Sequence, residues 1–270
     1  MTRFDEVRIS KAIMDAYHRK VSKHLKGDVV IAGAGPSGML AAGLLSQRGL
    51  KVVVVEKRLT PGGGVWGGAM TMNEVAIQEE ALEIVEELKV RHVEVGEGLY
   101  TVDAMELASA LCLHAVRSGA TILNMMYVED VCIHEGSVKG VVVNRTLGPT
   151  PLPVDPMTLM ASAVVDATGH ETVLVELLQK RGLLEGSRIA RRLGDGPMNA
   201  VEGERFVVEH VGEAYPGLWL CGMAVCAAYG GPRMGPIFGG MLLSGRRVAD
   251  RITERLGVAS TASPAEVGAG

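Results

Sequence analysis

The fold class is decided by residues 29–38, which read VVIAGAGPSG. The first four residues are apolar and predict a short buried strand, and Gly33, Gly35 and Gly38 then form a Gly-x-Gly-x-x-Gly turn that opens a helical pattern. Glycines at these places permit a tight turn and let a pyrophosphate approach backbone N–H groups at the start of the helix. The stretch therefore predicts a dinucleotide-binding turn.

A second strand completes a βαβ unit. Residues 51–56, KVVVVE, form the continuous apolar run that is typical of strands in parallel sheets, and Glu56 ends it. A carboxylate at this place accepts hydrogen bonds from ribose hydroxyls and repels a 2′-phosphate, although neighbouring Lys57 and Arg58 weaken that argument against NADP. The residues alone leave NAD and FAD both open. A glycine turn that binds no ligand is the less favoured alternative.

The rest of the chain predicts an α/β fold, with a Rossmann-like, flavoprotein-like parallel sheet and a smaller β-rich insertion around residues 120–150. We expect one domain over residues 1–257 and a disordered tail over 258–270. Further helices are predicted at 6–23, 76–89, 103–118 and 237–256, and further strands at 121–134, 139–145, 161–167 and 218–222.

Composition limits the class of function. The net charge is −4 without a long basic run, which gives no support for nucleic-acid binding. No stretch approaches the roughly 20 apolar residues of a membrane span, and the first 26 residues lack the apolar core of a signal peptide. We therefore expect a cytoplasmic protein without a membrane partner. Its cysteines form no metal-ligand pattern and are expected to be reduced thiols in or near the core: Cys112, Cys132, Cys221 and Cys226.

Four further motifs resemble one family, the thiamine thiazole synthases, and in particular its archaeal and bacterial members. They are residues 62–68 (GGGVWGG), 154–156 (VDP), 167–170 (ATGH) and 232–241 (PRMGPIFGGM), in addition to the turn at 31–38. The resemblance covers the chain from about residue 10 to residue 255.

The resemblance implies an enzyme that consumes NAD as a co-substrate, condenses its ADP-ribose part with glycine and inserts sulfur, giving an ADP-thiazole carboxylate. It also implies a homo-octamer. Carried over position by position, the residues that contact the dinucleotide are Ser37, Glu56, Lys57, Gly64, Val128, Pro153, Val154, Asp155 and Met223, beside Gly33, Gly35 and Gly38 of the turn.

The same resemblance implies three catalytic residues. Asp155 and His170 would hold a catalytic Fe(II), for which a carboxylate oxygen and an imidazole nitrogen are suitable ligands. Without the motifs, a loop Asp and a core His would be the ordinary interpretation of this pair. Arg233 would clamp the glycine carboxylate with its planar guanidinium, and the alternative for it is a structural salt bridge.

Pro153 departs from the family pattern. Eukaryotic members carry at this place a Cys that gives up its own sulfur, and archaeal sulfide-using members commonly carry a His. Proline has neither a sulfur nor a ring nitrogen, so the sequence predicts that sulfide in solution supplies the sulfur. Only the backbone of Pro153 is expected to approach the dinucleotide.

Three other functions fit parts of the same pattern. An FAD-dependent oxidoreductase would share the dinucleotide turn and would purify yellow. A sugar-phosphate isomerase could use the same fold. A nucleotide-binding regulatory protein without catalysis is disfavoured, because it gives no reason for Asp155, His170 and Arg233 to occur together.

Overall fold

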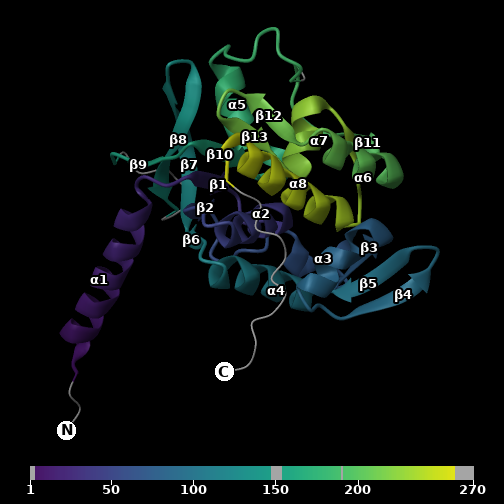
Figure 1. Cartoon of the computed structure of the whole chain (residues 1–270), viewed down its shortest axis with the longest axis horizontal. Coiled ribbons are helices and arrows are strands. Elements are labelled where there is room, and N and C mark those ends of the chain that lie inside the picture. The colour runs from purple at the N-terminus through teal and green to yellow at the C-terminus, as the bar shows by residue number, and fades with distance from the viewer. Residues whose placement is uncertain (1–3, 147–153, 190, 259–270) are drawn as a thin grey trace.

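The computed structural model describes residues 4–146, 154–189 and 191–258. A six-stranded sheet with strand order β12-β13-β10-β1-β2-β6 lies at its centre (Figure 1). Five of these strands are parallel, and β12 pairs antiparallel with β13 at one edge. The strands are β1 (Val29–Ala32), β2 (Val52–Glu56), β6 (Thr121–Asn124), β10 (Ala163–Asp166), β12 (Gly212–Tyr215) and β13 (Leu218–Leu220).

The predicted Rossmann-like sheet is therefore confirmed. Its central strands β1, β2, β10 and β13 are buried along their whole length, as their continuous apolar sequences require. The strands predicted at 161–167 and 218–222 are present with slightly shorter bounds.

Three helices lie together beside the sheet: α2 (Pro36–Gln47), α4 (Ala104–Arg117) and α8 (Gly239–Arg255). Helix α2 packs onto β1 and β2 and is flanked by the other two. Glycines permit this close packing, because a Cβ on Gly43 would lie 2.2 Å from a ring carbon of His114, and one on Gly245 would lie 2.6 Å from the Ser37 carbonyl oxygen. The helices predicted at 103–118 and 237–256 are confirmed.

A smaller antiparallel sheet and helix α5 (Val173–Lys180) also pack against the central sheet. The sheet consists of β7 (Met126–His134), β8 (Ser137–Arg145) and β9 (Met157–Met160). The single strand predicted over 121–134 is wrong in one respect: Met125 has a φ of 57°, which ends β6 and starts β7 in a different sheet. The single domain over 1–257 stays a prediction. The predicted tail spans 258–270, and its residues from 259 onward lie outside the described part of the chain.

The helix predicted over 76–89 is wrong at its start, where the structure has a strand, and right over its later part. The chain there forms β3 (Glu74–Gln78), a short 3₁₀ turn and α3 (Leu82–Glu87). Strand β3 pairs with β5 (Leu99–Asp103), which pairs with β4 (His92–Gly96). The apolar positions Val75, Ile77, Ile84 and Val85 are all buried, so the pattern of the strand runs on into that of the helix without a visible break.

The leading helix is confirmed as α1 (Glu6–His24) and projects from the body of the molecule (Figure 1). Shorter elements surround the site discussed below: α6 (Ala200–Glu209), α7 (Met223–Tyr229), β11 (Gly196–Met198) and β14 (Pro232–Arg233). Over the described ranges, every helix is too short or too polar to span a membrane.

A buried carboxylate fixes the turn that follows β10. Asp166 is fully buried, and its Oδ1 accepts hydrogen bonds from the backbone N–H (3.0 Å) and the hydroxyl (2.7 Å) of Thr168. Its Oδ2 accepts from the N–H groups of Leu174 (2.9 Å) and Val175 (3.3 Å) at the start of α5. Burial raises the pKa of Asp166, while these hydrogen bonds favour the carboxylate. The side chain thus joins the strand end, the turn and the helix.

Replacing Asp166 with Asn should lower the free energy of unfolding by about 2–3 kcal/mol, because an amide NH₂ would then face N–H and O–H donors. Urea denaturation of both proteins measures the difference. The matched control is Asp15→Asn on α1, where the exposed carboxylate pairs with the exposed Lys11, so the expected change is below about 0.5 kcal/mol. Equal effects of the two substitutions would contradict this role of Asp166.

Candidate active site

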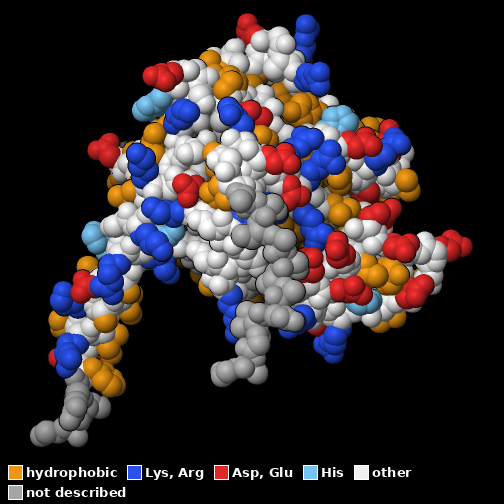
Figure 2. Space-filling model, viewed as in Figure 1, with side chains coloured by type: hydrophobic (Ala, Val, Ile, Leu, Met, Phe, Trp, Pro, Cys, Tyr) orange, Lys and Arg blue, Asp and Glu red, His pale blue; other side chains and the backbone are white. Residues whose placement is uncertain are grey.

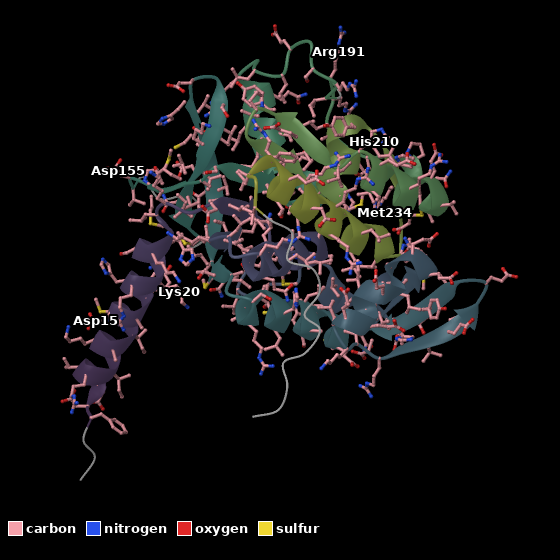
Figure 3. The ribbon with its side chains drawn as sticks, in the orientation of Figure 1. Asp15, Lys20, Asp155, Arg191, His210 and Met234 are labelled. Carbon is pink, nitrogen blue, oxygen red and sulfur yellow. The ribbon has the colours of Figure 1, made fainter. Side chains whose placement is uncertain are left out.

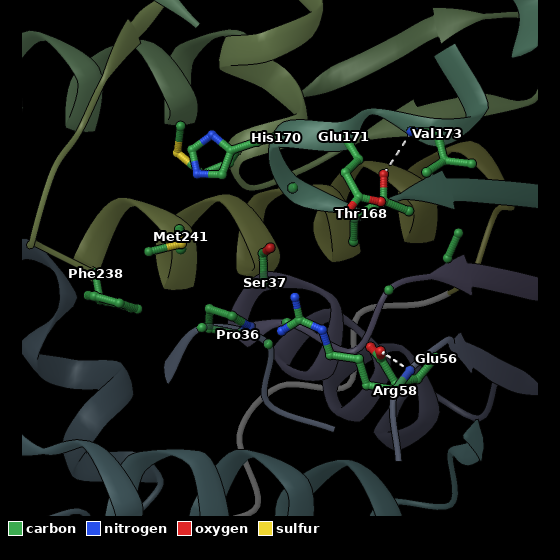
Figure 4. Close-up of a pocket in the computed structure, with 18 of the residues that line it drawn as sticks. Pro36, Ser37, Glu56, Arg58, Thr168, His170, Glu171, Val173, Phe238 and Met241 are labelled. Carbon is green, nitrogen blue, oxygen red and sulfur yellow. Dashed lines mark hydrogen bonds between the residues drawn. The ribbon is translucent and has the colours of Figure 1, made fainter. Parts of the chain in front are cut away.

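A cavity of about 520 Å³ opens at the carboxyl ends of β1, β2 and β10 (Figure 4). In parallel sheets this edge is where ligands bind, and the volume suits a small molecule. Ten of the predicted site residues line the cavity: Gly33, Gly35, Ser37, Glu56, Lys57, Gly64, Val128, His170, Met223 and Arg233.

The two glycine-rich segments are packed against each other. The N–H of Gly62 donates to the carbonyl oxygen of Ala34 at 2.7 Å, and a Cβ on Gly63 would lie 3.1 Å from the Cα of Gly35. Trp66 closes this loop by donating from Nε1 to the carbonyl oxygen of Pro61 at 2.6 Å. The second loop therefore supports the dinucleotide turn from outside, and Trp66 packs in the loop.

Gly38 does not line the cavity. A Cβ at this position would lie 2.2 Å from the carbonyl oxygen of Gly33 and 3.1 Å from the Cβ of Ala167. The third glycine of the motif therefore lets α2 begin close against the ends of β1 and β10.

Glu56 lines the cavity and is buried, with 6% of its surface exposed. Its Oε2 accepts from the N–H of Ala34 and its Oε1 from the N–H of Arg58, both at 2.8 Å. Each carboxylate oxygen can accept a second hydrogen bond. Glu56 thus holds the glycine turn in place and keeps acceptor capacity for a hydroxyl-bearing ligand.

Lys57 forms an ion pair with Glu171, whose carboxylate oxygens lie 2.6 Å from the ammonium nitrogen. The pair joins the end of β2 to the turn after β10, and both residues line the cavity. Both side chains are about half exposed, so the pair contributes at most about 1 kcal/mol and can open for a ligand. The sequence analysis did not select Glu171, although it directly follows the Ala-Thr-Gly-His motif.

Arg233 extends from β14 at the side of the cavity. Strand β14 pairs with β11, and the carbonyl oxygen of Arg233 accepts from the N–H of Asn199 at 3.0 Å, which fixes its backbone. Among the described residues no carboxylate pairs with its guanidinium, and the residue is exposed. The arrangement leaves the guanidinium available for an anion, rather than using it in a structural salt bridge.

His170 lies on the turn after β10 and reaches the cavity (Figure 4). Its Nδ1 lies within hydrogen-bond distance of Oδ2 of Asp195. No pattern in the sequence singled out Asp195, which lies 25 residues further along the chain.

The other predicted iron ligand, Asp155, does not line this cavity, nor does Val154. Val128 lines it from β7, and β8 and then β9 lie between Val128 and the outer edge of the sheet, with Val128 opposite Val143 and Val143 opposite Met157. Met157 therefore lies about 10 Å from Val128 across the sheet. Asp155, two residues before it, lies at the periphery of the molecule (Figure 3).

Within a single chain, His170 therefore lines the cavity and Asp155 does not. Within the described ranges, no group of three or more His, Cys, Asp or Glu side chains is arranged to hold a metal ion. Pro153 lies outside the described residues.

The four cysteines are free thiols, as predicted. Cys221 and Cys226 are fully buried, and neither lines the cavity. Burial raises the pKa of both thiols to about 12. Since the thiolate is the reactive form, neither is a competent nucleophile at neutral pH.

The comparison with known proteins decides the family. Residues 10–238 match the Thi4 family. The chain belongs to the Thi4 family.

Thi4-family relatives resemble it along nearly the whole chain. The thiamine thiazole synthase of Thermococcus kodakarensis is 49% identical over 253 residues, covering 93% of this chain and 99% of that protein. The thiamine thiazole synthase of Thermotoga maritima is 48% identical over 254 residues, covering 93% and 98%. The crystal structure of Thermovibrio ammonificans THI4 superposes with a TM-score of 0.89 at 41% identity, covering 95% of this chain and all of that one. The chain is therefore an enzyme of thiamine thiazole biosynthesis, which confirms the resemblance seen in its motifs.

Proposed function

We propose that this Thi4-family enzyme makes an ADP-thiazole carboxylate from NAD, glycine and sulfide with the help of Fe(II). The observation that carries the proposal is that one cavity is lined by a glycine turn, a buried carboxylate and an arginine that has no carboxylate partner among the described residues. Each of the three meets one part of the chemistry: the pyrophosphate, a ribose and the glycine carboxylate. We expect this reaction in the cytoplasm.

The adenosine half of NAD is assigned to the inner part of the cavity. The N-terminus of α2, with Pro36 at its first position, carries unpaired N–H groups and the positive end of the helix dipole, which favour a pyrophosphate. Glu56 lies beside this turn with remaining acceptor capacity for ribose hydroxyls. Its negative charge favours NAD over NADP.

Glycine is assigned to Arg233. A planar guanidinium binds a carboxylate through two parallel hydrogen bonds, and strand β14, which carries Arg233, is held between β11 and α6. Binding there would place the glycine amino group inside the cavity, where it can reach the carbonyl of the ADP-ribose part.

Arg233→Lys should raise the KM for glycine at least tenfold, because an ammonium group cannot make the bidentate contact. Arg233→Ala should cost about 2–5 kcal/mol in kcat/KM for glycine if the carboxylate is desolvated. Steady-state kinetics with glycine and with NAD varied separately measure both effects, and the KM for NAD should change little. The control is Arg205→Lys on the exposed face of α6, which should leave both values unchanged. A normal glycine KM in Arg233→Lys would remove Arg233 from the glycine site.

Fe(II) is assigned to His170 and Asp155. An imidazole on the cavity wall fits a ferrous site, whereas Asp155 of the same chain lies beyond the outer strands of the small sheet. If both residues hold the metal, they meet between two copies of the chain or after the chain rearranges. When bound, the ion would supply a Lewis acid that orients sulfide and substrate.

Solution sulfide is the proposed sulfur source. The position of the sacrificial Cys holds Pro153, and the buried thiols of Cys221 and Cys226 have pKa values raised to about 12. No cysteine therefore combines exposure to the cavity with nucleophilic reactivity.

With excess sulfide, NAD, glycine and Fe(II) under anaerobic conditions, the enzyme should form more than one product molecule per chain and keep its intact mass. Chromatography of the product and mass spectrometry of the protein measure both quantities. Cys221→Ala and Cys226→Ala should retain multiple turnovers. A single turnover with a loss of about 34 Da at a cysteine, the mass of hydrogen sulfide lost on β-elimination, would show a sacrificial mechanism instead.

Self-association into a homo-octamer is the last part of the proposal; the number eight comes from the family resemblance. Helix α1 supports an interface between copies. One face of this helix carries a stripe of apolar side chains. Two of them, Tyr17 and Val21, pack against the body. The stripe continues outward through Val7, Ile13 and Met14, which are 75%, 65% and 69% exposed. Figure 2 shows hydrophobic side chains along one edge of this helix and mainly Lys and Arg along the other. An exposed apolar stripe of this kind is typical of an interaction surface.

Met14→Glu combined with Ile13→Glu should reduce the assembly size measured by light scattering, because the charges would be buried in the interface. Ala12→Glu, on the opposite face of the same helix, serves as the control and should leave the size unchanged. A monomer in the unmodified protein, or an unchanged assembly in the double variant, would contradict this interface.

A further inference from the structure

Asp195 stands out as a partly desolvated carboxylate whose described partner is a single histidine. Its side chain is 14% exposed, and Oδ2 lies within hydrogen-bond distance of Nδ1 of His170. The other oxygen, Oδ1, is buried and has no hydrogen-bond partner among the described residues. His170 itself is half exposed at the cavity. The pair therefore runs from a largely buried carboxylate to a ring nitrogen at the cavity wall.

We propose that Asp195 is a positioning residue that fixes the ring orientation and the tautomer of His170, so that Nδ1 carries the hydrogen and Nε2 keeps its lone pair. An ionised carboxylate only accepts hydrogen bonds, so it selects the ring form that donates from Nδ1. In the neutral ring Nε2 is then the nitrogen that can bind a ligand. The effect on Fe(II) rests on the proposed function, whereas the effect on the ring does not.

The backbone on both sides of Asp195 is anchored. The N–H of Gly194 donates to the carbonyl oxygen of Ala227 at 2.8 Å, and the N–H of Gly196 donates to that of Gly231 at 2.7 Å. Gly196 then begins β11, which pairs with the strand that carries Arg233. The carboxylate is thus held at a fixed place relative to α7 and to the proposed glycine site.

The backbone that carries His170 is equally constrained. Gly169 has a φ of 73° and Thr172 a φ of 41°, so both ends of this turn are in the left-handed region. Asp166 binds Thr168 just before the turn and the N–H groups of α5 just after it. The backbones that carry His170 and Asp195 are therefore both fixed. We infer that the hydrogen bond between the two side chains then sets the position of the His170 ring.

The consequence for metal binding follows from general coordination chemistry. Histidines that bind metals commonly donate their second ring N–H to a carboxylate, which orients the ring and increases its basicity. Loss of such a partner weakens metal binding about 10–100-fold. Asp195 would serve His170 in this way without contacting the metal or the substrate.

The first test reads the ring itself. Protein labelled with ¹⁵N-histidine is studied by magic-angle-spinning NMR, which is not limited by assembly size, at pH 8, above the ordinary histidine pKa of about 6.5. His170→Ala identifies the signals. We expect the Nδ1–H form in the unmodified protein and a substantial Nε2–H population in Asp195→Asn, which keeps the side-chain shape, and in Asp195→Ala. The control is Asp130→Asn on β7, which removes an ion pair with Arg181 at the end of α5 and should leave the ring unchanged.

The second test measures metal affinity with Co(II) as the probe, by titration calorimetry of the full-length protein. Asp195→Ala should bind about 10–100-fold more weakly than the Asp130→Asn control, while NAD affinity stays the same. An Nε2–H ring in the unmodified protein, or a ring unchanged in both Asp195 variants, would overturn the proposal. The expected ring change without Co(II) binding by any variant would support the positioning role and contradict the iron assignment.

Discussion

The backbone of the glycine turn after β1 lies directly against the backbone of the turn after β10, and the site depends on this contact. A Cβ on Gly33 would lie 2.5 Å from the carbonyl oxygen of Ala167, so no side chain fits between the two turns. The ladder continues to this point, where the N–H of Ala167 donates to the carbonyl oxygen of Ala32 at 2.8 Å. Two segments that are far apart in sequence are thereby joined at one edge of the sheet. One carries the dinucleotide turn and the other carries His170.

Every other part of the cavity is attached to this junction. Glu56 ties the turn after β1 to the end of β2, and Asp166 ties the turn after β10 to α5. The Gly62–Gly64 loop supports the first turn from outside, and β11 and β14 bring Asp195 and Arg233 from the other side. The glycine turn, Glu56 and Arg233, to which the proposed function assigns a pyrophosphate, a ribose and a carboxylate, thus lie on separate elements around one edge of the sheet.

The sequence predicted those parts whose physical signal is local. Fully buried parallel strands appear as continuous apolar runs, so β1, β2, β10 and β13 could be found, and the glycine turn identified the binding edge. The sheet of β3, β4 and β5 was missed because β4 is largely exposed and because the apolar positions of β3 run on into those of α3. Met125 separates β6 from β7 through its positive φ, and a methionine side chain gives no indication of such a backbone conformation. Asp195 and Glu171 act through contacts that exist only after folding, so no spacing in the chain could reveal them.

The identity of the bound nucleotide tests the central claim, that this cavity takes NAD apart rather than binding a flavin. The protein is purified from the cells that produce it under anaerobic conditions, and its absorbance spectrum is recorded. It is then denatured, and the released small molecules are identified by mass spectrometry. The account predicts an ADP-thiazole or another species derived from ADP-ribose, and a colourless protein. Stoichiometric FAD with a yellow absorbance spectrum would contradict it.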